Sequence, residues 1–171
     1  MIKFDERLIP FILQFEGGYA EVPGDLGGPT NSGITLGTFQ QFFGADKTKE
    51  DLKKMSYVQW RYIFEKGFVN KCKADQIKNE SVAYMLVDFA WHSGVKTSVK
   101  VLQRIVGVEA DGVVGNKTLA AVNSMNGEKL FYKYFNARQN YLYQIINHRP
   151  ANGKFELGWL RRLYALYNLC Y

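Results

Sequence analysis

Glu16 stands where an apolar segment gives way to glycine, and this setting suits acid chemistry. Phe15 precedes it, and Gly17 and Gly18 follow. If the preceding segment is a helix, the carboxyl group lies at the negative end of the helix dipole beside apolar side chains, and both features favour the protonated form. A protonated carboxyl is what a general acid needs near neutral pH. The alternative is a glutamate that simply ends a surface helix, with Gly17 directly after its cap.

Asp25 and Thr30 follow Glu16 in a loop rich in glycine and proline. Two carboxyl groups that flank a sugar are the minimum for glycoside hydrolysis, because one protonates the leaving oxygen and the other assists water. A threonine hydroxyl nearby is suited to orient that water. In the alternative interpretation, Asp25 is an ordinary turn residue, and Thr30 and Asn31 cap the loop through their side chains.

Asp88 and His92 belong to a segment, residues 79–92, that is apolar nearly all round and is expected to form a buried helix. A buried aspartate must be hydrogen-bonded, so Asp88 either lines a cleft or holds the structure together. His92 is either a functional base or a histidine satisfied at the end of the helix. Two isolated histidines without ligand spacing predict no metal site, and no cofactor is predicted.

Helices are expected to position these residues. The apolar pattern over residues 5–15, with Asp5 as its N-cap, predicts the first helix. Residues 17–37 hold seven glycines and are expected to form a loop with a short hairpin. Helical periodicity returns over residues 35–43. The predicted caps are Thr35 and two capping boxes, Thr48 with Asp51 and Ser56 with Gln59.

The second half of the chain is also expected to be helical. Thr97 is expected to cap one helix, and Asn116 to cap the next after a turn at Asp111-Gly112. A long helix over residues 127–147 is followed by an aromatic-rich helix from about Phe155. The sequence therefore predicts an all-α fold with a small glycine-rich region near residues 17–37.

Composition and charge narrow the class of partner. Hydrophobic residues make up 47% of the chain and charged residues 22%, as in ordinary folded proteins. Residues 1–95 carry 11 basic and 12 acidic side chains, whereas residues 96–171 carry 11 basic and 4 acidic ones. This asymmetry points to a polyanion, for which nucleic acid, an anionic membrane and bacterial cell wall all qualify. The basic residues form no recognisable nucleic-acid motif, and no apolar run approaches the ~18 residues of a membrane span.

The stretch FEGGYAEVPGDLGGPTNSGITLGTF, residues 15–39, closely resembles the opening motif of glycoside hydrolase family 108, muramidases also labelled secretion activator proteins. That family has Glu-Gly-Gly-Tyr, then Asp-x-Gly-Gly-x-Thr, then Gly-Ile-Thr in this order. The resemblance implies a lysozyme-like fold in which Glu16 is the catalytic acid. It further implies that Asp25 and Thr30 assist the reaction. The residues expected to bind substrate in this region are Tyr19, Asn31 and Thr35.

A second block, VDFAWHSGV at residues 87–95, is also similar to the family. There an Asp on the buried helix precedes an Asn-Ser-Gly turn, and His92 stands where Asn is more usual. The resemblance places Asp88 and His92 among the substrate-binding candidates, beside their structural alternatives.

Residues 96–171 resemble the peptidoglycan-binding segment predicted to follow in this family. Its helix, Asp-Gly turn and helix could instead be a packing motif without ligand contact. Near the end of the chain, Trp159 is expected to stack on sugar, unless it is a core residue. Arg161 and Arg162 are candidates to hold carboxylates of the anionic wall, provided that they face it.

Together these features predict a peptidoglycan hydrolase that cuts between N-acetylmuramic acid and N-acetylglucosamine with inversion. Residues 1–95 would form the catalytic lobe and residues 96–171 the binding segment, packed as one unit. The expected partner is the peptidoglycan glycan strand, with no nucleic acid and no stable membrane insertion, and the chain is expected to be a monomer. The alternatives are a lytic transglycosylase and a non-catalytic wall-binding or secretion-accessory protein.

The N-terminal segment is broken by charges and by Pro10, so it lacks the continuous apolar stretch of a secretory signal. We therefore expect synthesis in the cytoplasm and action at the cell wall or periplasm after release. Release through a holin pore and release through a dedicated exporter are both open.

Overall fold

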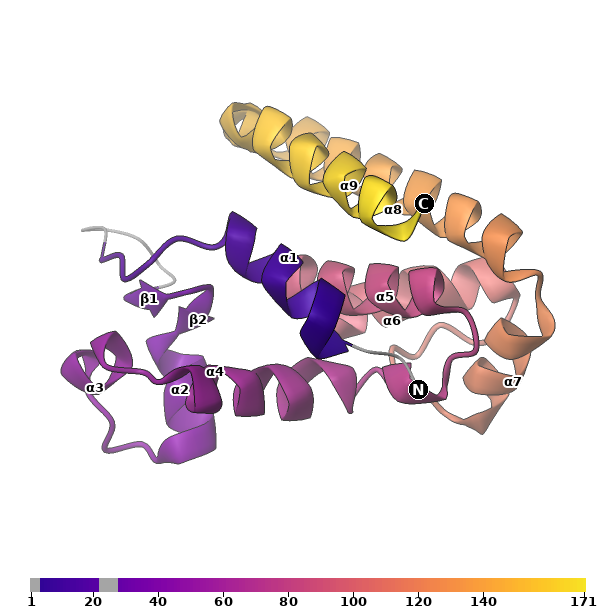
Figure 1. The fold of residues 1–171 in the computed structure, drawn as a ribbon. Coiled ribbons are helices and arrows are strands. Elements are labelled where there is room, and N and C mark those ends of the chain that lie inside the picture. The colour runs from indigo at the N-terminus through magenta and orange to yellow at the C-terminus, as the bar shows by residue number, and fades with distance from the viewer. Residues whose placement is uncertain (1–3, 22–27) are drawn as a thin grey trace.

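The computed structural model describes residues 4–21 and 28–171, and it confirms the predicted, mainly α-helical fold (Figure 1). The α-helices are α1 (Ile9–Phe15), α2 (Leu36–Phe43), α3 (Lys49–Lys53), α4 (Tyr57–Phe64), α5 (Glu80–Ser93), α6 (Val95–Val106), α7 (Asn116–Ser124), α8 (Gly127–His148) and α9 (Glu156–Cys170). Shorter helical turns are η1 (Phe4–Leu8), η2 (Glu65–Val69), η3 (Ala74–Gln76) and η4 (Pro150–Phe155), and the strands are β1 (Thr30–Asn31) and β2 (Ile34–Thr35).

Three of the predicted helix starts are confirmed at the level of the cap. Thr35 accepts a hydrogen bond from the backbone N–H of Thr38 at the start of α2. The capping boxes that open α3 and α4 are both complete. In each box the cap side chain accepts a hydrogen bond from the backbone N–H three residues on, and the side chain of that third residue accepts one from the backbone N–H of the cap.

Other helix starts differ from prediction. Asp5 lies inside the π-helical turn η1 and pairs with Arg61 instead of capping a helix. Thr97 lies inside α6, because the helix already begins after Gly94. The φ of +88° at Gly94 lets the chain leave α5 and enter α6 without a spacer. Similarly, α7 has Gly115 as its N-cap, so Asn116 is its first residue.

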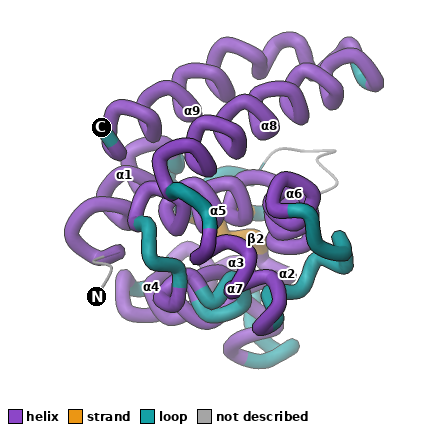
Figure 2. The backbone as a smooth tube through the Cα atoms, turned by 90° about the vertical axis from the view of Figure 1, so that its right-hand side faces the viewer, coloured by secondary structure: helices purple, strands orange, loops and turns teal. Residues whose placement is uncertain are grey.

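Helix α5 is the centre of the molecule, and α6, α8 and α9 pack against it. Figures 1 and 2 show α8 and α9 side by side along one side, with α1 and α5 beneath them. Ile12, Leu86, Phe131 and Leu163, from α1, α5, α8 and α9, are all 0% exposed in one hydrophobic core. Residues from both sides of position 95 therefore share this core.

A two-residue turn joins β1 to β2 at Ser32 and Gly33, which confirms the short hairpin. Both turn residues have positive φ, 47° and 79°, the pattern of a type I′ turn. Two side-chain hydrogen bonds hold the hairpin in place. Trp60 of α4 donates to the Ser32 carbonyl at 2.9 Å, and Asn31 of the hairpin donates to the Leu52 carbonyl of α3 at 2.8 Å. The hairpin turn is therefore held rigidly against α3 and α4.

In the part of the chain that the structure describes, no helix is long and apolar enough to cross a membrane.

Candidate active site

Glu16 caps the C-terminal end of α1, and its side chain is 17% exposed. Its Oε1 accepts two hydrogen bonds, from Nε1 of Trp91 at 2.8 Å and from Nη1 of Arg162 at 2.7 Å. Within the described residues, Oε2 accepts none. The carboxyl group is thus anchored through one oxygen and free to react through the other.

Trp91, on the last turn of α5, is held in place by other aromatic rings. Its ring centroid lies 4.8 Å from that of Phe68, 5.3 Å from that of Trp60 and 5.9 Å from that of Phe64. Such tilted aromatic contacts fix ring orientation as well as position. The indole N–H that binds Glu16 is therefore part of a rigid wall.

Arg162 connects Glu16 to a buried carboxylate. From α9, its Nη2 and Nε donate to Oδ1 of Asp88 at 2.7 and 3.1 Å, while Nη1 reaches Glu16. Arg138, from α8, pairs with the other oxygen of Asp88 at 2.8 Å. The side chains of Arg162, Asp88 and Arg138 are 7%, 0% and 1% exposed. One buried aspartate therefore holds two buried arginines.

The charges of this cluster set the protonation of its members. Burial raises the pKa of Asp88, but the guanidinium charges of Arg162 and Arg138 outweigh burial and hold that pKa at about 2. His92 lies close to the same arginines, and burial followed by the Arg138 and Arg162 charges lowers its pKa to about 4. Asp88 is therefore ionised and His92 neutral near neutral pH.

Gly33, at the tip of the hairpin, lies directly over the Glu16 carboxyl group. A Cβ built on Gly33 would come within 2.6 Å of Oε2 of Glu16 and within 2.8 Å of the Trp91 ring. The φ of +79° at this position also favours glycine. The hairpin thus forms the side of the site that faces the unbonded oxygen.

Two protein families match adjacent parts of this chain. The family described as "Glycosyl hydrolase 108" matches residues 9–94, and a "Predicted Peptidoglycan domain" matches residues 97–164. The chain belongs to the glycosyl hydrolase 108 family. The two matches together indicate a hydrolase family that acts on peptidoglycan.

Among solved structures, this family member is similar to SagA of Brucella abortus. The two are 35% identical, the match covers 92% of this chain and 88% of the SagA chain, and the TM-score is 0.81. No curated protein matches.

Three of the remaining predicted residues of this glycosyl hydrolase 108 chain belong to the hairpin. Thr30 and Thr35 pair across it, so their side chains share one face, opposite to Asn31. The amide of Asn31 and the hydroxyl of Thr35 make the fold contacts given above. Tyr19 donates to Glu21 at 2.9 Å. Asp25 lies outside the described residues. A catalytic role for Asp25 and Thr30 and a substrate-binding role for Tyr19, Asn31 and Thr35 stay predictions.

Trp159 and His92 contact each other edge to face, with ring centroids 5.8 Å apart. Trp159 also stacks on the half-exposed Phe155. Arg161 is exposed, but Arg162 is buried in the ion-pair cluster. Arg162 therefore does not face the wall, and its candidate role there is wrong.

The sequence-based predictions gave no role in this site to Gly33, Trp91 and Arg138, and gave Arg162 a different one. A signal for Arg138 does exist in the sequence. Arg138 lies on the same helical stripe as buried Phe131, Tyr134, Phe135 and Leu142. A cation on an apolar stripe needs a buried anion, and Asp88 on its apolar helix is the complementary signal.

Among the described residues, no group of three or more His, Cys, Asp and Glu side chains could hold a metal ion.

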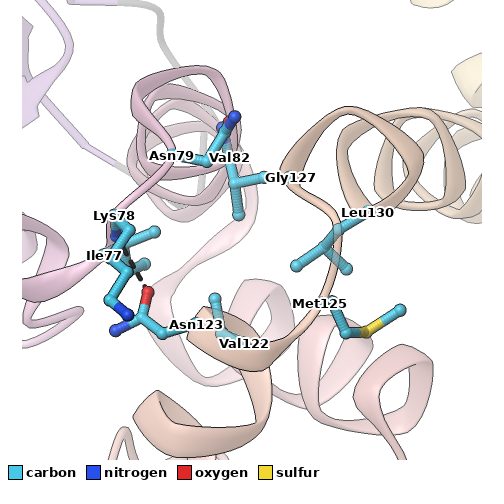
Figure 3. Close-up of a pocket in the computed structure, with 9 residues that line it drawn as sticks. All are labelled: Ile77, Lys78, Asn79, Val82, Val122, Asn123, Met125, Gly127 and Leu130. Carbon is cyan, nitrogen blue, oxygen red and sulfur yellow. Dashed lines mark hydrogen bonds between the residues drawn. The ribbon is translucent and has the colours of Figure 1, made fainter.

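A cavity of about 270 Å³ lies away from this site, between the start of α5 and the junction of α7 and α8. There Asn123 accepts a hydrogen bond from the backbone of Lys78 (Figure 3). None of the residues around Glu16 lines it.

Proposed function

We propose that this chain is an N-acetylmuramidase in which Glu16 protonates the glycosidic oxygen between N-acetylmuramic acid and N-acetylglucosamine. The observation that carries this proposal is the state of the Glu16 carboxyl group. It lies in the family's opening motif, it is mostly buried, and only one of its oxygens is bonded within the described residues.

The two donors on Oε1 decide which oxygen transfers the proton. An oxygen that accepts from both an indole N–H and a guanidinium has no room for a proton of its own. The catalytic proton therefore resides on Oε2, beside Gly33 at the hairpin tip. A sugar that lies along the hairpin would present its glycosidic oxygen to Oε2.

Water attack would come from the opposite face of the sugar, with inversion. We assign the orientation of this water to Thr30, because Thr30 lies on β1 of the hairpin whose tip residue Gly33 lies over Glu16. The backbone of Thr30 is fixed by paired hydrogen bonds with Ala20 at 2.8 and 2.9 Å. Asp25 lies in the segment between Ala20 and Thr30. In an inverting enzyme, ~6.5–9.5 Å separates the two carboxyl groups and leaves space for that water.

The basic second half would hold the wall. The net charge of +7 in residues 96–171 complements the lactyl and peptide carboxylates of peptidoglycan. In this proposal the chain is a monomer that acts at the wall after release from the cytoplasm, with residues 1–95 as catalytic lobe and residues 96–171 as binding segment.

The test is the loss of turbidity of purified sacculi with wild type, Glu16→Gln and Glu65→Gln as the matched control, since Glu65 is exposed on η2. Glu16→Gln should lower the rate by about 10²–10⁴-fold, the usual contribution of a positioned acid, and Glu65→Gln should not. Mass analysis of the fragments should show muramic acid reducing ends.

Other results would redirect the assignment. Anhydromuramic ends would indicate a lytic transglycosylase. Binding of the wild-type protein to sacculi without any cleavage would indicate an accessory protein. Lysis at the wild-type rate by folded Glu16→Gln would remove Glu16 from the mechanism.

A further inference from the structure

Arg162 is the one residue in the described ion-pair cluster that contacts both carboxylates. It belongs to α9, which lies within the segment matched to the predicted peptidoglycan domain, whereas Glu16 and Asp88 belong to the glycosyl hydrolase match. A residue of the presumed binding segment thus reaches the proposed catalytic acid.

The guanidinium of Arg162 has little freedom to leave Glu16. Two of its nitrogens are bonded to Asp88, and its carbon lies 5.6 Å from the centre of the Phe15 ring. Asp88 is itself fixed from its other side by Arg138. A planar group held at two nitrogens can present its third nitrogen in only one direction.

We propose that Arg162 is a positioning residue for Glu16, and that α9 is consequently part of the catalytic centre and more than a wall anchor. By occupying Oε1, Arg162 fixes the rotation of the carboxyl group and leaves the proton on Oε2. The catalytic meaning of this role rests on the proposed function, but the positioning itself does not.

Among the charged and titratable groups around Glu16 in the described residues, Arg162 is the cation in direct contact. Arg162 comes from α9, and Arg138 from α8 lies behind Asp88. Asp88 from α5 is neutralised by the two arginines, and His92 from α5 is uncharged near neutral pH. Replacement of Arg162 therefore removes the one guanidinium bond on the Glu16 carboxyl group.

The indole N–H of Trp91 offers a direct readout that needs no enzymatic activity. It donates to the same Glu16 oxygen at 2.8 Å, so its NMR signal should report any displacement of that carboxyl group. In Arg162→Gln this signal should shift and its hydrogen exchange should become faster, because the carboxyl group is no longer fixed in rotation. Arg161→Gln, which removes the neighbouring exposed cation, should leave the signal unchanged.

A second measurement uses no variant at Arg162, in case Arg162→Gln does not fold. In the wild-type protein, the Nη1–H signal of Arg162 and the Trp91 indole signal both report bonds to Oε1 of Glu16. Glu16→Gln should move both signals, because it changes the acceptor that they share. An unmoved Arg162 Nη1 signal in Glu16→Gln, or an unmoved Trp91 signal in folded Arg162→Gln, would overturn the positioning role.

Kinetics on sacculi add the catalytic part. Arg162→Gln should lower kcat by about 10- to 100-fold with little change in KM. Arg162→Lys should recover only part of the loss, because an ammonium cannot bond Asp88 and Glu16 in one plane. If the wild type cleaves no glycan while the Trp91 signal still shifts in Arg162→Gln, the proposed function fails and the positioning role stands.

Discussion

The Nη1 of Arg162 donates to Oε1 of Glu16 at 2.7 Å, and this bond joins residues 146 positions apart. It crosses the boundary between the two family matches at residues 94 and 97. The buried core crosses the same boundary. Contacts of this kind make the second segment a structural partner of the first, and they explain why Arg162 is unavailable to the wall.

Gly33→Ala should damage both stability and activity. The left-handed backbone costs about 1–2 kcal/mol for a residue with a Cβ, and that Cβ would press on Oε2 of Glu16. A displacement of about 1 Å at a reacting group can cost 10²-fold in rate. The measurement is the rate of sacculus lysis beside the free energy of unfolding in urea.

Gly107→Ala is the matched control for this substitution. Gly107 has a similar φ of +76°, but no atom lies within 4 Å of the position that its Cβ would take. It should lose stability alone. Equal loss of activity in the two variants would show that contact with Glu16 is not the cause.

Asp88→Asn should change how the protein responds to acid. The folded-state pKa of Asp88, about 2, lies below its ordinary value of 3.8, so its stabilising contribution is complete above about pH 4 and is lost as the pH falls toward 2. Removing the charge should cost about 3–5 kcal/mol at pH 7, because Arg138 and Arg162 lose their common anion. Urea unfolding of both proteins between pH 2 and 7 should show curves that converge in acid.

Asp75→Asn, at an exposed site on η3, is the control for Asp88→Asn and should follow the wild-type curve. Parallel curves for Asp88→Asn and wild type across this range would mean that Asp88 does not carry the predicted charge.

His92→Gln should reduce the loss of stability in mild acid. The folded-state pKa of His92, about 4, lies below its ordinary value of 6.5, so the unfolded chain binds more protons between these values. Stability is complete above about pH 6.5 and falls by up to about 1.4 kcal/mol per pH unit as the pH drops toward 4. Stability measured from pH 7 to 4 should therefore be flatter in His92→Gln, whereas the exposed His148→Gln should keep the wild-type slope.

Binding to sacculi should weaken as salt rises, because exposed charges are screened over ~8 Å at physiological ionic strength. Lys129 and Lys133 are exposed on α8 in the basic half. Their joint replacement by Gln should lower binding and reduce its salt dependence. The pair Lys54→Gln and Lys71→Gln, in the half with balanced charge, should have little effect in the same pull-down.

Local structure is predictable where neighbouring residues decide it. The caps at Thr35, Thr48 and Ser56 need only a side chain and the backbone three residues on, and all three are confirmed. The predicted cap at Thr97 is wrong because a glycine with positive φ, Gly94, allows the helix to begin earlier. The residue at which α6 begins depends on how α5 and α6 pack, and a short stretch of sequence carries no information on that packing.

The candidate site is predictable only in part, for a related reason. The opening motif points to Glu16, whose position after Phe15 at the end of α1 is a local feature of the sequence. Its partner Arg162 reaches the site because α9 packs on α5. There Arg162 bonds to Asp88, a residue 74 positions earlier in the sequence. This buried cation escapes prediction because no spacing rule links residues so far apart.

The distance along the chain between Glu16 and Arg162 also sets an order of events during synthesis. A ribosome adds about 5–20 residues per second, so Glu16 emerges about 7 s or more before the residue that anchors it. During that interval the carboxyl group lacks its guanidinium, and Asp88 on α5 lacks one of its two arginine partners. A nascent chain released before residue 162 would carry the family's whole opening motif without the anchor that orients its acid.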